Sequence, residues 1–249
     1  SEFEARAFGL QHQLEHAERY KIAHEYVNIV KGLWDSWEDD AFIHDKAHNR
    51  FFDPSKLHRL AHQGAKFNVQ GSLQAPRAPQ GYPVLVQAGS SNDGQDLAAA
   101  SAELVFTAQQ TVEDARAFYS ALKSRLPAWG RTEQSLKILP GISPFVGRTQ
   151  QEAQDKFEQL QELIDPVLGV GLLSAFLGNI DLSAYPIDGP FPVDLPVGEG
   201  WKSRHELFNK LAQRDNLSIR DLYKRVATGR GHWTLVGTPE TIADELEHW

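Results

Sequence analysis

The spacing of apolar side chains changes along the chain and separates its first part from the rest. Residues 14–37 have the clearest helical pattern, because apolar residues recur there at spacings of three and four. That stripe consists of Tyr20, Ala23, Val27, Val30, Trp34 and Trp37. Residues 38–80 are polar and irregular, with FNVQG (67–71) as one short strand candidate. Because so long a connection is uncommon within one domain, we expect an insertion that is mobile and serves as a lid.

From residue 83 onward, short apolar runs alternate with helical patterns. PVLVQA, ELVFTA and LKILPGISPFVG predict strands over 83–88, 103–108 and 136–147, the first of them buried. Helices are predicted over 92–102, 111–126, 148–164, 203–213 and 218–227. This alternation indicates parallel βα units, as in a doubly wound sheet or a (β/α)8 barrel.

Turn and capping residues set the limits of these elements. Thr111, followed by acidic residues, and Thr238, followed by Pro239 and Glu240, are typical helix starts. Residues 166–200 contain AYPIDGPFPVDLPVGEG, which is too rich in Pro and Gly for regular helix, so we expect a second insertion there. The run TLV before Thr238 is too short to predict a strand, and TGRGHW (228–233) is interpreted as a loop.

Composition narrows the class of protein. A chain of 249 residues, 41% apolar, fits one large α/β domain over 1–249. The net charge of −8 gives nucleic-acid binding little support, and the lack of cysteine excludes disulfides and cysteine catalysis. No apolar run reaches about 18 residues, so we expect no membrane span and a cytoplasmic location. The chain has no Met and ends within a helical pattern, so we expect a fragment.

The turn after the first predicted strand carries more Gly and Ser than a simple turn needs. Gly89 lets the backbone turn sharply, while Ser90 and Ser91 offer hydroxyls and amide N–H groups. The next helix directs its positive end at this turn, which suits a phosphate. An ordinary loop with capping side chains explains the same residues. Neither a P-loop nor a dinucleotide fingerprint is present.

Histidines provide the remaining candidate chemistry. His232 lies in the second Gly-rich turn with Arg230, and with an ordinary pKa near ~6.5 it could donate or take a proton, or simply face solvent. Three pairs have the i,i+4 spacing that binds metals on a helix: His12/His16, His44/His48 and His58/His62. None has the H-E-x-x-H pattern, so we expect solvated surface and no metal. Phe51 and Phe52 are pocket or lid candidates within the first insertion.

Four segments together resemble a known family. They are ERYKIAHEYVNIVKGLWDSWEDDAF, PVLVQAGSSNDGQDLAAASAELVFTAQ, AFLGNIDLSAYPIDGP and VGTPETIADEL. Their sequence and order resemble the bacterial-luciferase-like flavin monooxygenases, in the branch with nitrilotriacetate, dibenzothiophene-sulfone and long-chain alkane monooxygenases. The resemblance covers nearly the whole chain, and it implies a (β/α)8 TIM barrel with insertions at 38–80 and 166–200.

The resemblance also implies a function. Members use reduced FMN and O2 to oxygenate a small organic substrate through a C4a-(hydro)peroxyflavin. A separate NAD(P)H-dependent flavin reductase would supply the FMN, and we expect a homo-oligomer, a dimer or tetramer. The FMN phosphate would lie at Gly89, Ser90 and Ser91, with Tyr20 reaching it unless that ring is a core residue. Arg230 would contact the cofactor, and His232 would be catalytic.

Two other classes stay open. A phosphate-binding barrel enzyme without redox chemistry would need a Lys or a carboxylate pair at its strand ends, where this chain has Ala88, Ala108 and Pro140. A truncated, catalytically incomplete chain could instead serve as a binding or partner module. Family members have strands before EARAFGL and after ADELEHW, which favours that alternative.

Overall fold

The computed structural model describes residues 2–192, 194–196 and 202–249. The short helix α1 (Glu2–Ala7) precedes the long helix α2 (His16–Trp34), which confirms the helix predicted over 14–37 with both ends shorter. Ile29 is the buried residue of α2, although it lies outside the predicted stripe. The stripe itself is mostly half-buried, because α2 packs with one side against α3 and with another against β1.

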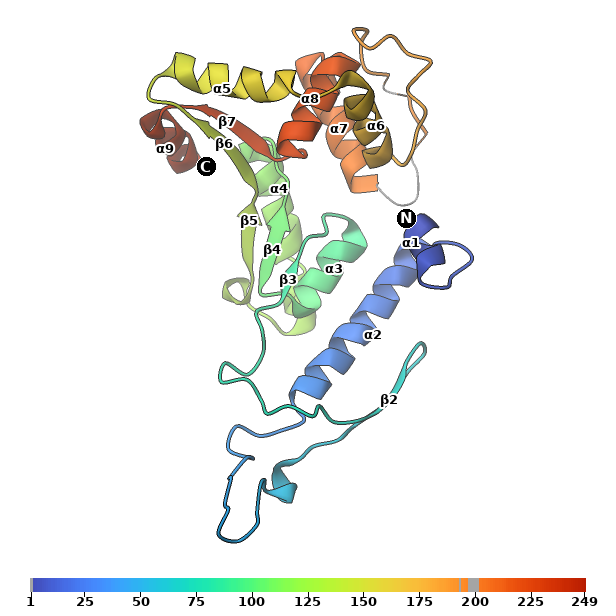
Figure 1. The fold of residues 1–249 in the computed structure, drawn as a ribbon, viewed down its shortest axis with the longest axis vertical. Coiled ribbons are helices and arrows are strands. Elements are labelled where there is room, and N and C mark those ends of the chain that lie inside the picture. Colours follow the sequence, from blue (N-terminus) through green and yellow to red (C-terminus); the bar gives the residue numbers. More distant parts are fainter. Residues whose placement is uncertain (1, 193, 197–201) are drawn as a thin grey trace.

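The first insertion contains a hairpin and a cluster of aromatic rings. After the 3-10 turn η1 (Pro54–Lys56), strands β1 (Leu60–Gln63) and β2 (Asn68–Gly71) pair antiparallel, so the FNVQG strand is confirmed. The rings of Phe42 and Phe52 pack on Trp37, while Phe51 remains 59% exposed. Figure 1 shows the loops of this insertion at the end of α2 that is far from α1.

A parallel sheet of three strands follows, in the order β3-β4-β5. Its strands are β3 (Val86–Gln87), β4 (Leu104–Thr107) and β5 (Lys137–Pro140), with α3 (Asn92–Ser101) and α4 (Val112–Lys123) between them in the chain. The helices cover one face, where Val105 packs among alanines and leucines of a buried cluster. The prediction of a buried first strand is wrong: β3 is an edge strand, and Val86 is 60% exposed.

The strand predicted over 136–147 is divided at Gly141. β5 pairs with β4, whereas β6 (Ile142–Val146) pairs in parallel with β7 (Trp233–Gly237). One apolar run therefore serves two sheets. The judgement that TLV is too short for a strand is also wrong, because Trp233 and Gly237 extend it into a strand that pairs along its whole length with β6.

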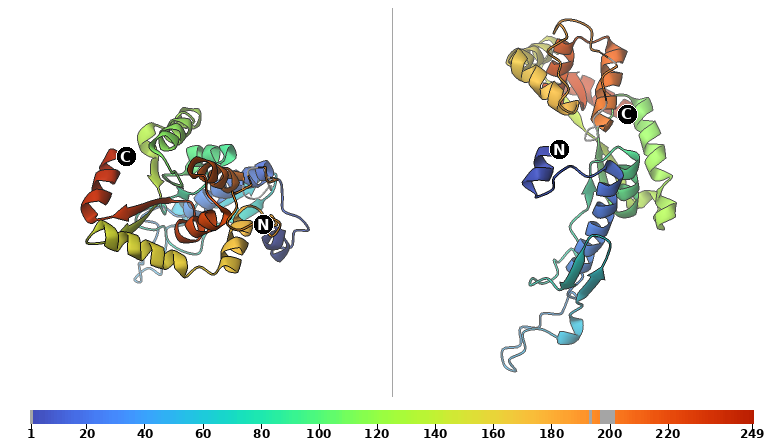
Figure 2. Two further views of the ribbon diagram at one scale, coloured as in Figure 1. Left: turned by 90° about the horizontal axis from the view of Figure 1, so that it is seen from above. Right: turned by 90° about the vertical axis from the view of Figure 1, so that its right-hand side faces the viewer.

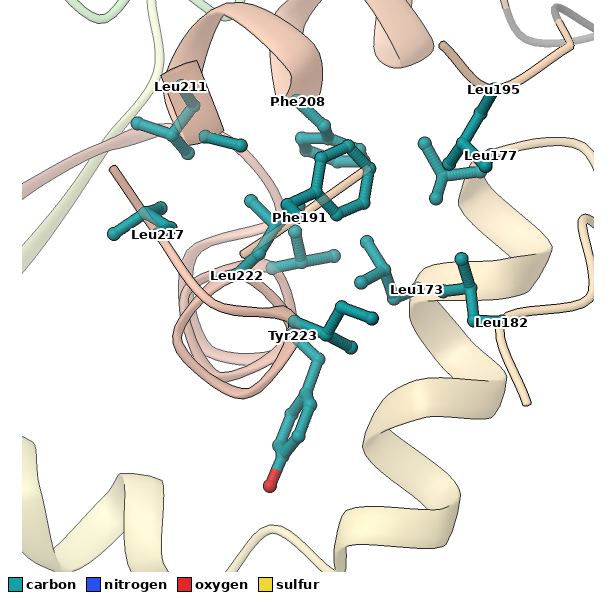
Figure 3. Packing of buried hydrophobic residues seen from close by; sticks show 13 residues of the cluster. Leu173, Leu177, Leu182, Phe191, Leu195, Phe208, Leu211, Leu217, Leu222 and Tyr223 are labelled. Atoms are coloured by element: carbon teal, nitrogen blue, oxygen red, sulfur yellow. The ribbon is translucent and has the colours of Figure 1, made fainter. Parts of the chain in front are cut away.

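The remaining helices are α5 (Gln150–Glu162), α6 (Pro166–Phe176), α7 (Lys202–Asp215), α8 (Ile219–Gly229) and α9 (Pro239–His248). Of these, α5 and α9 pack against the β6-β7 pair, and α6 packs against α8. The expectation of irregular chain from residue 166 is wrong at its start, because Asp165 caps α6 and Pro166 occupies its first position. Leu173, Phe208 and Leu222 bring α6, α7 and α8 together in one buried cluster (Figure 3).

The described parallel strands do not close into a barrel. The strand order is β3-β4-β5 in one sheet and β6-β7 in the other, and the pairing changes at Gly141. The right-hand view of Figure 2 shows that the molecule is elongated. The parallel βα arrangement predicted from the sequence is confirmed. Among the described helices, none is both long and apolar enough to cross a membrane.

Candidate active site

The turn between β3 and α3 is held by its own side chains. Ser91 is the N-cap of α3, and its Oγ accepts a hydrogen bond of 3.2 Å from the amide of Gly94. The buried Gln95 donates to the carbonyl of Ser90 at 2.9 Å, and the Gln87 side chain accepts from the amide of Gly89. The start of α3 therefore faces this turn with a fixed backbone, as anion binding by a helix N-terminus requires.

Tyr20 reaches this turn from α2. Its Oη lies 2.9 Å from the position that a Cβ would take on Gly89, and also 2.9 Å from that position on Gly94. Neither glycine has a left-handed φ, so glycine is needed at these positions for the space that it leaves and not for its backbone conformation. The structure thus brings Tyr20, Gly89 and Ser91 together at one helix N-terminus.

Two further residues of α2 belong to the neighbourhood of Tyr20, one through a ring contact and one through the sequence. The His16 ring lies 4.9 Å from the Tyr20 ring, and its Nδ1 is 2.8 Å from the carboxylate of Asp93 in the first turn of α3. The Nε of Arg19 is buried and has no partner among the described residues. Sequence reasoning missed Arg19, although its place beside Tyr20 in ERY was a signal. A buried guanidinium N–H without a partner is suited to an anionic ligand.

The second Gly-rich turn is also held in place. Arg230, at φ 51°, is the C-cap of α8, and Gly231 follows at φ 83°. Gln110, after β4, donates to the carbonyl of Gly231 at 2.6 Å, and Arg204 of α7 donates to the carbonyl of Arg230 at 3.2 Å. The backbone that carries His232 is therefore fixed from two sides.

His232 packs against the end of β4. Its ring lies 5.0 Å from the ring of Phe106, and its buried Nδ1 has no hydrogen-bond partner among the described residues. Burial, and then the positive charges of Arg204 and Arg230, lower the pKa of His232. The imidazole is therefore neutral at pH 7.

His232 stands at the start of β7, which would be the wrong end for a barrel active site. However, the amide of Trp233 donates to the carbonyl of Gly141 at 3.3 Å, and the amide of Gly141 donates to the carbonyl of Thr107 at 2.8 Å. Thr107 and Pro140 end β4 and β5. His232 therefore lies where those two strands have their carboxyl ends, which is the edge that active sites of such folds use.

Both turns border the end of β4, on its two faces. Ser90 Oγ lies 3.4 Å from the hydroxyl of the buried Thr107, on the face that the helices cover. Phe106 points to the opposite face, because side chains alternate along a strand, and there it meets His232. A ligand that crosses this edge would have one end at the Ser90 turn and the other beside His232.

Several of the paired histidines bind carboxylates. His48 bonds Asp45, His58 bonds Glu38, and His62 bonds Glu25. The expectation of solvated surface is wrong for His62 and also for His16, whose side chains are only 24% and 22% exposed. Among the described residues, no group of three His, Cys, Asp or Glu is placed to hold a metal ion.

Comparison with known proteins decides the family. The profile described as luciferase-like monooxygenase matches residues 1–249. The chain belongs to the luciferase-like monooxygenase family. Its fold is accordingly the luciferase-like α/β fold, as the resemblance implied.

Other luciferase-like monooxygenases are similar over almost the whole chain. N-acetyl-S-(2-succino)cysteine monooxygenase of Bacillus subtilis is 50% identical over 97% of the chain, and nitrilotriacetate monooxygenase component A of Aminobacter aminovorans is 48% identical over 99%. The crystal structure of DmoA from Hyphomicrobium sulfonivorans superposes with a TM-score of 0.83 at 32% identity, covering 99% of this chain and 52% of that one. The chain spans 55% and 54% of the length of the two curated relatives.

Proposed function

We propose that this chain is part of an FMNH2-dependent monooxygenase of a two-component system, which uses O2 to oxygenate a small organic substrate. The observation that supports it most is the convergence of the Tyr20 phenol, the Gly89 turn and the N-terminus of α3 at the carboxyl edge of the parallel strands. Because the chain spans about half of its curated relatives, the activity is proposed for the whole protein.

The residues at the first turn fit the phosphate of FMN. Tyr20 and Ser90 provide hydroxyl donors, and the α3 N-terminus provides amides and a positive dipole end. Because Gly89 and Gly94 have no side chain, the Tyr20 hydroxyl can approach this turn closely. When bound and reduced, FMN would supply the electrons that activate O2.

His232 is suited to move a proton beside the reacting centre. Its neutral ring can accept a proton. The positive charges of Arg204 and Arg230 disfavour a protonated His232 ring, so the ring readily gives the proton back. The sequence left open whether His232 donates or takes a proton, and its lowered pKa favours taking one first.

The two guanidinium groups beside His232 also favour a substrate with a carboxylate. Arg204 lies over the Phe176 ring and donates to the carbonyl of Arg230, so both cations border the same turn. Both relatives above are named for acting on compounds that carry carboxylates. Arg230 was expected to contact the cofactor, and Arg230→Gln distinguishes the roles: a substrate contact raises KM alone, whereas a cofactor contact weakens FMNH2 binding.

A flavin reductase is the partner that this chemistry requires. The word component in the name of the nitrilotriacetate relative supports an enzyme of more than one part. We therefore propose that an NAD(P)H-dependent flavin reductase provides FMNH2.

Oxygen labelling tests the proposed activity. The protein is supplied with FMNH2 by a flavin reductase under 18O2, together with candidate carboxylate substrates, and products are analysed by mass spectrometry. Label in a product only when the protein is present supports the monooxygenase. FMNH2 binding without any labelled product would instead favour the truncated binding module.

A further inference from the structure

Gly141 lies between β5 and β6 and is held on both sides. Its amide donates to the carbonyl of Thr107 at 2.8 Å, and its carbonyl accepts from the amide of Trp233 at 3.3 Å. Since β5 pairs with β4 and β6 pairs with β7, the strand changes partner at this residue. The backbone of Gly141 therefore cannot move without disturbing two sheets.

The space above Gly141 is filled by two rings. A Cβ on Gly141 would lie 2.6 Å from His232 Nδ1 and 2.6 Å from Phe106 Cζ, well inside van der Waals contact. The φ of Gly141 lies outside the left-handed region, so an L residue could adopt this backbone. Glycine is required here for space and not for conformation.

The backbone of the loop that carries His232 is held in place, so only the imidazole ring can move. The amide of His232 donates to the carbonyl of Gly229 at 2.8 Å, and Gln110 holds the carbonyl of Gly231. A Cβ on Gly231 would itself meet Leu207 and Phe208 within 3.0 Å, so this loop has no room to retreat toward α7. A side chain at position 141 would therefore displace the imidazole and leave the loop in place.

We propose that Gly141 is a positioning residue for His232: its missing side chain makes the seat in which the imidazole is held against Phe106, with Nδ1 toward the strand break. The catalytic part of this proposal rests on the proposed function, whereas the placement of the ring does not. Burial of His232 in this seat is also the main reason that its pKa is lowered, with Arg204 of α7 and Arg230 of the same loop as the charged groups that face it.

The test compares Gly141→Ala with Gly171→Ala in the intact protein. Gly171, in α6, has open space where a Cβ would be, so its replacement is the matched control. The titration of His232 is followed by NMR of 13C-labelled histidine and assigned with His232→Asn. In Gly141→Ala the titration midpoint rises toward that of an exposed histidine, and turnover falls about 10- to 100-fold through misplacement. Gly171→Ala changes neither.

An unchanged His232 titration in a folded Gly141→Ala protein would overturn the proposal. If Gly141→Ala does not fold, Phe106→Leu removes the opposite wall of the seat without adding atoms, and the midpoint must rise there too. An unchanged midpoint in Phe106→Leu would then overturn the proposal. Should the midpoint rise while turnover stays constant, the ring is positioned as inferred, and the catalytic role of His232 in the proposed function is what fails.

Discussion

The Tyr20 hydroxyl lies 2.9 Å from the place that a side chain would occupy on Gly89, although the two residues belong to different elements distant in the sequence. This proximity places the long helix α2 beside the turn before α3. It directs a phenol O–H toward the same point as the α3 N-terminus. The phosphate site proposed here depends on that meeting.

Replacing Tyr20 by Phe is expected to weaken FMNH2 binding about tenfold. Only the hydroxyl is removed, and a hydrogen bond to a charged phosphate contributes about 1.5 kcal/mol or more. The measurement is anaerobic equilibrium titration. Tyr26→Phe is the matched control, because Tyr26 lies on the same helix and is 56% exposed. Equal affinities for Tyr20→Phe and the wild type would place the phosphate elsewhere.

Replacing Ser91 by Ala is expected to affect both folding and FMNH2 binding. Ser91 Oγ accepts from the Gly94 amide as the cap of α3, so its loss costs about 1 kcal/mol of stability. Thr149→Ala removes an equivalent cap from α5, because Thr149 Oγ1 accepts a hydrogen bond of 3.1 Å from the amide of Glu152. Denaturant melts of the two variants should agree, and only Ser91→Ala should lose flavin affinity, about tenfold or more. A loss of stability alone would make Ser91 a helix cap and nothing else.

Replacing His232 by Asn is expected to lower turnover by about 10² to 10⁴ with FMNH2 affinity within a few-fold. The wild-type rate should fall as the pH drops through the lowered pKa of His232, because the protonated ring cannot accept a proton. That fall therefore lies on the acid side of the usual histidine range. Steady-state rates with excess reductase from pH 5 to 8 provide the measurement. A rate insensitive to the substitution would reduce His232 to a polar residue of the turn.

Replacing Asp215 by Asn is expected to destabilise the fold in a pH-dependent way. A hydrogen bond from Arg214 is the main cause that lowers the pKa of Asp215 to about 2. Burial opposes this effect, and a hydrogen bond from Arg225 of α8 adds to it. A carboxyl with a depressed pKa stabilises the fold above its ordinary pKa, here 3.8. Because both arginines are over a third exposed, we expect about 1 kcal/mol at pH 7.

That difference between the wild type and Asp215→Asn should shrink as the pH falls from about 4 to 2 and vanish below. Urea unfolding at several pH values measures it, with Glu247→Gln on the exposed side of α9 as the control. A difference that is as large at pH 2 as at pH 7 would show that packing and not charge is responsible.

Local signals predicted the elements well, and non-local pairing explains most of the errors. Thr111 and Thr238 cap α4 and α9 as expected, because caps depend on neighbouring residues alone. The break at Gly141 could not be predicted, since it depends on which strands pair on either side. β7 was missed because its apolar core is short and its partner β6 lies far away in the chain.

The candidate site shows the same division. The Gly and Ser of the first turn were evident in the sequence, and the family resemblance added Tyr20. The surroundings of His232 come from Phe106, Gly141 and Arg204, which lie far apart in the sequence, and no local pattern joins them. Its lowered pKa could therefore be recognised only in the folded chain.

The most direct test of the central claim compares reduced FMN with reduced riboflavin, which lacks the phosphate. Both are titrated anaerobically into the wild type and into Tyr20→Phe. If the Gly89 turn holds the phosphate, reduced riboflavin binds the wild type at least about tenfold more weakly than FMNH2, and Tyr20→Phe narrows that ratio. Equal affinities of the wild type for the two flavins would contradict a phosphate site at this turn.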